Sequence, residues 1–142
     1  MATEKLFQVG VKALITNSDA KILVLDSGDW HLKHQKRHWD IPGGRVQEGH
    51  SVQETLQREI GEETGIKKIE SSDFFTAVVS NHQIPFEDKM LGLVLMVYKV
   101  KIPAKSQIKL SDEHTDYEWV SKKEASKRLA QKYPPQFTKL LV

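Results

Sequence analysis

The stretch from Ser51 to Gly65 is the strongest structural signal in the sequence, and it constrains the fold most. Ser51 with Glu54 three residues later forms a capping-box signature, which is typical of a helix N-terminus. An apolar stripe with four-residue spacing follows, made by Val52, Leu56 and Ile60. Gly65 supplies a helix stop. We therefore predict an amphipathic helix that needs an apolar surface to pack on.

Several apolar stretches outside this helix predict strands that could form that surface. They are Gln8 to Ile15, Ile22 to Leu25, Phe74 to Val79, Leu91 to Val100 and Tyr117 to Val120, with a short extended piece from Trp39 to Ile41. Turn residues between the first two strands predict a hairpin, and the polar segment Asn81 to Lys89 is predicted to be a loop. Ser121 with Glu124 repeats the capping box before a second helix that reaches about Gln131. The pattern predicts a single mixed α/β layer structure over residues 1–142.

Composition narrows the possible chemistry. The 142 residues contain no cysteine, which excludes disulfides, thiolate metal sites and a cysteine nucleophile. The net charge of +2 is too small to indicate binding to nucleic acid or a membrane. Met1 to Phe7 lacks the apolar core of a signal peptide, and no apolar run reaches membrane-spanning length. We therefore expect a cytoplasmic protein with no nucleic-acid or membrane partner.

Three glutamates occupy one turn of the predicted first helix. Glu59, Glu62 and Glu63 have i, i+3 and i+4 spacing, so their side chains are expected to converge on one flank. At a separation of roughly 6 Å each pair would repel by about 0.7 kcal/mol in water and about 3 kcal/mol at an effective dielectric near 20. Two kinds of compensation are open: the nearby basic residues Arg58, Lys67 and Lys68, or a bound cation. By itself the cluster is also compatible with a solvated helix face.

Gly43 and Gly44, just before the helix, favour the cation. Two successive glycines allow a phosphate to approach the backbone closely, or a carbonyl to face a metal. Oxygen ligands without thiols indicate Mg²⁺ or Mn²⁺ rather than zinc.

The stretch Gly44 to Ile66, GRVQEGHSVQETLQREIGEETGI, resembles the Nudix box. That pattern has a glycine, five residues, a glutamate, seven residues, then Arg-Glu-aliphatic-any-Glu-Glu-any-Gly-aliphatic. The positions in register are Gly44, Arg58, Glu59, Ile60, Glu62, Glu63, Gly65 and Ile66. One position departs, because His50 stands where the family has its first glutamate. That glutamate pairs with the box arginine, so Glu54, four residues before Arg58, is a candidate substitute.

The resemblance implies the α/β/α sandwich of the Nudix (MutT-like) hydrolases and assigns roles to individual residues. Glu62 and Glu63 would be the main metal ligands, and Glu59 a further ligand or the base that orients water. Gly43 would contribute a carbonyl ligand. Arg58 would orient a glutamate, so Arg58, Glu59 and Glu62 form the expected catalytic set.

Further residues outside the box complete the expected site. Nudix proteins often use an additional acid, and Glu113 is our choice ahead of Asp112 and Glu118, although a solvated loop carboxylate is an equally good interpretation. Basic side chains close to the glycine pair are candidates for holding the substrate's phosphates, namely Lys36, Arg37 and Arg45. For any one of them, a solvated basic loop is the alternative.

The resemblance implies metal-dependent hydrolysis of a phosphoanhydride bond in a nucleoside diphosphate derivative, such as a nucleotide sugar, or in a nucleoside triphosphate. The protein would act as a monomer or a homodimer. A second hypothesis is a nucleotide-binding module that is catalytically weak or inactive because of His50. A third, a scaffold whose box residues match by chance, requires eight registered coincidences. Neither fold nor box names the substrate.

Overall fold

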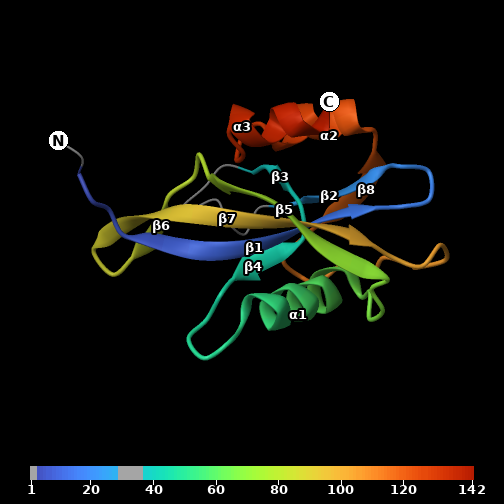
Figure 1. Cartoon of the computed structure of the whole chain (residues 1–142), viewed down its shortest axis with the longest axis horizontal. Coiled ribbons are helices and arrows are strands. Elements are labelled where there is room, and N and C mark those ends of the chain that lie inside the picture. The colour runs from blue at the N-terminus through green and yellow to red at the C-terminus, as the bar shows by residue number, and fades with distance from the viewer. Residues whose placement is uncertain (1–2, 29–36) are drawn as a thin grey trace.

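The computed structural model describes residues 3–28 and 37–142. Figure 1 shows a sheet of long strands with helices on both of its faces. The strands are β1 (Phe7–Thr16), β2 (Ile22–Asp26), β3 (Trp39–Asp40), β4 (Gly43–Arg45), β5 (Ser71–Val79), β6 (Ile84–Phe86), β7 (Lys89–Lys101) and β8 (Asp116–Val120). The helices are α1 (Val52–Thr64), α2 (Lys122–Leu129), α3 (Pro135–Thr138) and a 3₁₀ turn, Lys139–Leu141.

The sheet is mixed, as the sequence pattern predicts. Its main path runs β3-β2-β1-β7-β5, and β1 pairs with β7 in parallel over its whole length, from Phe7 opposite Gly92 to Thr16 opposite Lys101. The other ladders are antiparallel, including β4 on β1, β6 on β7 and β8 on β2. The predicted hairpin between β1 and β2 is present, with Asn17 Oδ1 accepting bonds from the backbone of its turn.

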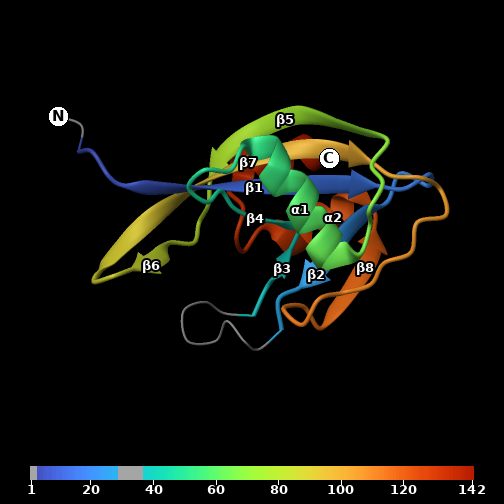
Figure 2. The ribbon, with the colours of Figure 1, turned by 90° about the horizontal axis from the view of Figure 1, so that it is seen from below.

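The two faces of the sheet carry separate apolar cores, because strand side chains alternate in direction. One core joins α1 to alternate β1 residues, with Leu56 and Ile60 packed against Val11, Ala13 and Ile15. The other joins Leu14 and its neighbours to α2 and α3 through Leu129, Tyr133 and Phe137. Figure 2, seen from below, shows α1 crossing the sheet on its own side. The α/β/α sandwich is therefore confirmed.

Three short elements were not expected from the sequence. Segment 81–89, predicted to be a loop, contains β6, which pairs with the start of β7. The glycine pair, which was not part of any predicted strand, forms strand β4 paired with β1. A third helix, α3, begins at the second of the two prolines, Pro135, with Pro134 as its N-cap. None of the helices within residues 3–28 and 37–142 is long and apolar enough to cross a bilayer.

Candidate active site at the glycine strand

Strand β4 contacts both the C-terminal half of α1 and the strand β1, and these two contacts need its glycines. The backbone N–H of Gly43 donates to Oε1 of Glu63 at 2.7 Å. A Cβ atom on Gly44 would lie 2.4 Å from Oε1 of Glu59, and one on Gly43 would lie 2.0 Å from the carbonyl oxygen of Val11. Any larger residue would therefore displace either the glutamate or the strand.

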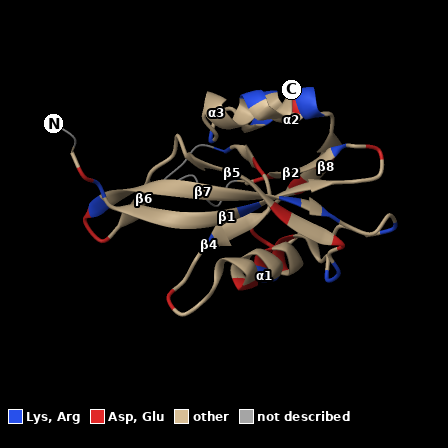
Figure 3. Ribbon diagram, viewed as in Figure 1, with Lys and Arg blue, Asp and Glu red and all other residues tan. Residues whose placement is uncertain are grey.

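The three box glutamates differ in exposure. The side chain of Glu63 is 7% exposed and that of Glu59 is 18% exposed, and both contact β4. The side chain of Glu62 is 61% exposed and lies 3.9 Å from Arg58. The expected common flank therefore holds for Glu59 and Glu63, whereas Glu62 extends into solvent. Figure 3 shows acidic residues along α1 and basic residues on α2.

Burial makes this cluster electrostatically costly. Burial raises the pKa of Glu63 to about 8, against the opposing effects of the Lys12 ammonium and the Gly43 N–H. Burial also raises the pKa of Glu59, and the charges of Glu62 and Glu113 add to that rise. Burial thus disfavours the ionised forms of Glu59 and Glu63, and a bound cation would stabilise them.

Two residues from the segment before β8 approach the cluster. Glu113 acts on the charge of Glu59, so the structure brings this predicted acid near the box, whereas Glu118 pairs with Arg128. His114 Nδ1 lies 3.6 Å from Oε2 of Glu63, and both side chains are nearly buried. The sequence analysis did not identify His114, although its position next to Glu113 was an available signal.

Arg58 is braced by the residue that departs from the Nudix pattern. Its Nη1 lies 2.9 Å from Nδ1 of His50, and because a guanidinium only donates, the ring nitrogen is the acceptor of this hydrogen bond. Its Nη2 lies 3.6 Å from Oε1 of Glu59. Glu54 was the candidate to replace the missing glutamate as the partner of Arg58. That expectation is wrong, because His50 itself makes the hydrogen bond to Arg58.

The three basic residues predicted to hold the substrate's phosphates do not lie together. Arg45 follows Gly44 at the end of β4 and is exposed. Arg37 instead makes a two-bond pair with Asp26, from Nε to Oδ1 at 3.0 Å and from Nη2 to Oδ2 at 2.7 Å. Lys36 lies outside the described residues. Of the three, Arg45 is the one that directly follows the glycine pair, and Arg37 is tied to β2.

A buried ion cluster lies on the other side of β4, and the sequence analysis missed it. Asp40 Oδ2 accepts from Lys12 Nζ at 3.0 Å and from Lys132 Nζ at 2.6 Å, and Oδ1 accepts from the Tyr133 hydroxyl at 2.6 Å. Burial opposes the ionisation of Asp40, yet the two ammonium groups hold its pKa well below the usual range. The charge of Lys12 also acts on Glu63 and Glu59, so this cluster and the glutamates influence each other.

The residues present fit a divalent cation by the chemistry of their donors. Among the described residues no three histidine, aspartate or glutamate side chains are already drawn together as a metal cage. The carboxylates of Glu59 and Glu63 nevertheless flank one glycine strand, and burial disfavours the ionised form of Glu63 despite the nearby Lys12 ammonium. Hard oxygen donors of this kind suit Mg²⁺ or Mn²⁺.

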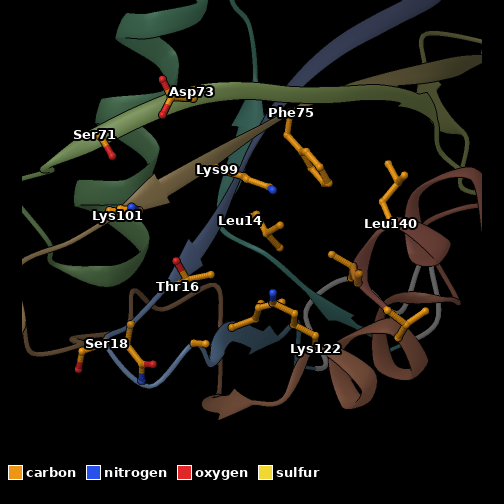
Figure 4. A pocket seen from close by; sticks show the side chains of 15 residues that line it. Leu14, Thr16, Ser18, Ser71, Asp73, Phe75, Lys99, Lys101, Lys122 and Leu140 are labelled. Carbon is orange, nitrogen blue, oxygen red and sulfur yellow. The ribbon is translucent and has the colours of Figure 1, made fainter.

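A cavity of about 480 Å³ lies between β1, β5, β7 and the C-terminal residues, and it is not part of this site. Figure 4 shows Lys99 from β7 and Lys122 from the start of α2 beside it, with Phe75 and Leu140 on its walls. Of the described residues that line it, none belongs to the predicted site.

The sequence model of the NUDIX domain matches residues 6–141. The chain belongs to the Nudix family. A MutT-like protein of Streptomyces ambofaciens is 27% identical over 128 residues, which cover 90% of this chain and 73% of that protein. The crystal structure of a MutT protein from Methanosarcina mazei Go1 superposes with a TM-score of 0.68 at 28% identity, covering 99% of this chain and 94% of that one.

Another solved structure shares the fold alone. The E. coli dihydroneopterin triphosphate pyrophosphohydrolase superposes with a TM-score of 0.70 at 20% identity, covering 96% of this chain and 99% of that one. The family assignment made from the box is confirmed, and Nudix proteins generally use divalent metals. In this Nudix chain the box spans β4, the connecting loop and α1, which places its acids beside the glycine strand.

Proposed function

We propose that this Nudix protein is a pyrophosphohydrolase that uses Mg²⁺ or Mn²⁺ to cut a phosphoanhydride bond in a nucleoside triphosphate or a nucleoside diphosphate derivative. The observation that carries the proposal is the position of Glu59 and Glu63 against β4, where Gly43 donates to one and Gly44 makes room for the other. Largely buried acids held against a glycine strand, whose charges a divalent cation would stabilise, are suited to polyphosphate chemistry.

Glu59, Glu62 and Glu63 would hold the metal, with the Gly43 carbonyl and Glu113 as further ligands. When bound, such a cation supplies a positive charge that stabilises the charge developing on phosphate oxygens. Exposed Arg45 would hold a phosphate of the substrate through two N–H groups. Arg58, fixed by His50, would keep Glu59 in position.

Hydrolysis would add one water across the P–O–P link. The water oxygen forms a bond to phosphorus, the bond to the bridging oxygen breaks, and that oxygen leaves with the electron pair. The proton lost by the water needs an acceptor. Glu59, where it does not ligate the metal, is suited to that role because its side chain lies against the glycine strand and is only 18% exposed.

The proposal is tested with a panel of nucleoside triphosphates, nucleotide sugars and dinucleoside polyphosphates, with and without Mg²⁺. We expect metal-dependent release of phosphate or pyrophosphate from at least one substrate, and a loss of about 100-fold or more in kcat/KM for Glu63→Gln. Glu70→Gln, at an exposed acid before β5, is the matched control and should keep its activity. No turnover of any member, with both variants equal to wild type, would disprove the proposal.

A second candidate, a nucleotide-binding module with little or no catalysis, is favoured by one observation. A histidine at position 50 contacts Arg58 where the family pattern has a carboxylate. For such a module we expect saturable nucleotide binding without turnover, together with strong hydrolysis in His50→Glu. If His50→Glu and wild type turn over substrate equally, His50 is an adequate brace and this candidate is rejected.

A further inference from the structure

The cavity of about 480 Å³ lies on the sheet face that α2 and α3 cover, apart from the glycine strand. It is bordered by the β1–β2 turn, the first half of β5, the last part of β7 and the C-terminal 3₁₀ turn. Its floor belongs to the apolar core of that face, because Leu14, Ile22 and Leu141 are almost fully buried. A cavity of this size with apolar walls and a few polar groups is typical of a small-molecule site.

Two lysines from different elements direct their ammonium groups into this cavity. Figure 4 shows Lys99 of β7 and Lys122 of α2 extending toward the same space, on either side of Leu14. The Nζ atom of Lys99 lies 4.3 Å from the centre of the Phe75 ring, which is a cation–π distance. This contact holds the ammonium group of Lys99 at the cavity wall.

Neither ammonium group is neutralised by an acid in the described part of the chain. Asp73 lies opposite Lys99 in the β5–β7 ladder, and Val142 also borders the cavity. Neither of these carboxylates forms an ion pair with Lys99 or Lys122, and neither ammonium donates a hydrogen bond to a described residue. Two like charges that face one space repel each other, and an anion placed between them would remove that repulsion.

The lining determines the kind of guest. Each ammonium has three N–H donors and no acceptor, so the pair suits the oxygen atoms of a carboxylate. Phe75 and Leu140 offer apolar surface on one side of the lysines (Figure 4). A cavity of about 150 Å³ holds one benzene ring, so about 480 Å³ has room for a ring and a short chain that carries an acid group.

We propose that this cavity is a second binding site, which takes a small organic acid. The carboxylate of the guest lies between Lys99 and Lys122, and its apolar body lies against Phe75 and Leu140. None of the described residues around the cavity belongs to the carboxylate cluster at the glycine strand. The inference therefore does not depend on the proposed function.

Three phenyl compounds of equal chain length test the need for an anion: 4-phenylbutanoate, 4-phenylbutan-1-ol and 4-phenylbutylamine. They carry the same apolar body with an anionic, a neutral and a cationic head. In NMR titrations of the wild-type protein, the acid should bind about tenfold or more tightly than the alcohol, because each ammonium gives it a charge-assisted bond. The amine should bind more weakly than the alcohol. The acid should shift the backbone amide signals of Thr16, Ile22 and Phe75, which line the cavity.

Lys122→Met removes one of the two charges and keeps a long side chain at the wall. It should weaken binding of the acid about tenfold, to a value close to that of the alcohol. Lys123→Met, at the next exposed lysine of α2 and outside the described lining, should keep the wild-type preference.

Several outcomes would overturn the inference. They are equal binding of acid and alcohol, no binding of the acid at millimolar concentrations, and shifted signals that lie away from the cavity. A Lys122→Met variant that is folded by circular dichroism and binds the acid as wild type does would also overturn it. None of these measurements reads nucleotide hydrolysis, so the proposed function can fail while the cavity assignment stands.

Discussion

His82 is a titratable group that has to stay neutral in the folded protein. Its ring meets that of His38 edge-on, with centroids 4.9 Å apart, beside the Asp40 cluster. Burial lowers the pKa of His82 to about 4, and the charges of His38 and Lys132 add to that effect. The same position that packs this ring against the ion cluster therefore penalises its protonation.

This shift predicts acid sensitivity in a defined pH range. Below pH 6.5 the unfolded chain binds a proton at His82 that the folded protein takes up only near pH 4, so this residue makes the free energy of unfolding fall from pH 6.5 to 4. His82→Phe keeps a ring and removes the titration, so its stability should fall less over that range. Urea denaturation at several pH values measures the difference. Parallel curves for wild type and variant would contradict the assignment.

Helix α1 holds the carboxylates, and its ends are fixed by local bonds. Ser51 Oγ accepts from the Glu54 N–H at 3.1 Å, and Gly65 ends the helix with φ +74°. Ser51→Ala should lower the free energy of unfolding by about 1 kcal/mol, because an N–H of the first turn loses its acceptor. Ser121→Ala removes the same 3.1 Å cap from α2 and is the comparison. Urea titrations of both variants test this, and an unchanged midpoint for Ser51→Ala would contradict it.

The predictable elements are those that depend on neighbours in the sequence. The capping box, the apolar stripe and Gly65 determine α1 locally, and the i, i+3, i+4 spacing places its glutamates. β6 escaped prediction because its polar surroundings resemble a loop, and only pairing of Ile84 with Leu91 makes it a strand. β4 escaped because glycines have low strand propensity, yet β1 offers a free edge to Gly43 and Gly44. Spacing also could not show that Glu62 extends into solvent.

At the scale of the whole molecule, the Asp40 cluster ties distant parts of the chain together. Asp40 in β3 binds Lys12 from β1, 28 residues away, and Lys132 and Tyr133 from the segment after α2, more than 90 residues away. No local pattern encodes such contacts, which is why sequence reasoning identified the acids of the site but not these lysines. The cluster joins the helical layer of α2 and α3 to the strands that border the glycine strand.

Removing the central charge of this cluster should weaken the whole fold. Asp40→Asn leaves two buried ammonium groups without their counter-charge, so the free energy of unfolding should fall by about 3 to 5 kcal/mol. Tyr133→Phe, which removes one hydrogen bond, should cost about 1 kcal/mol. Adding Lys132→Met to Asp40→Asn removes one of the orphaned charges, so the double variant should lose less stability than the two single losses combined. Additive losses in urea denaturation would show that Asp40 and Lys132 act independently and that the cluster does not hold the layers together.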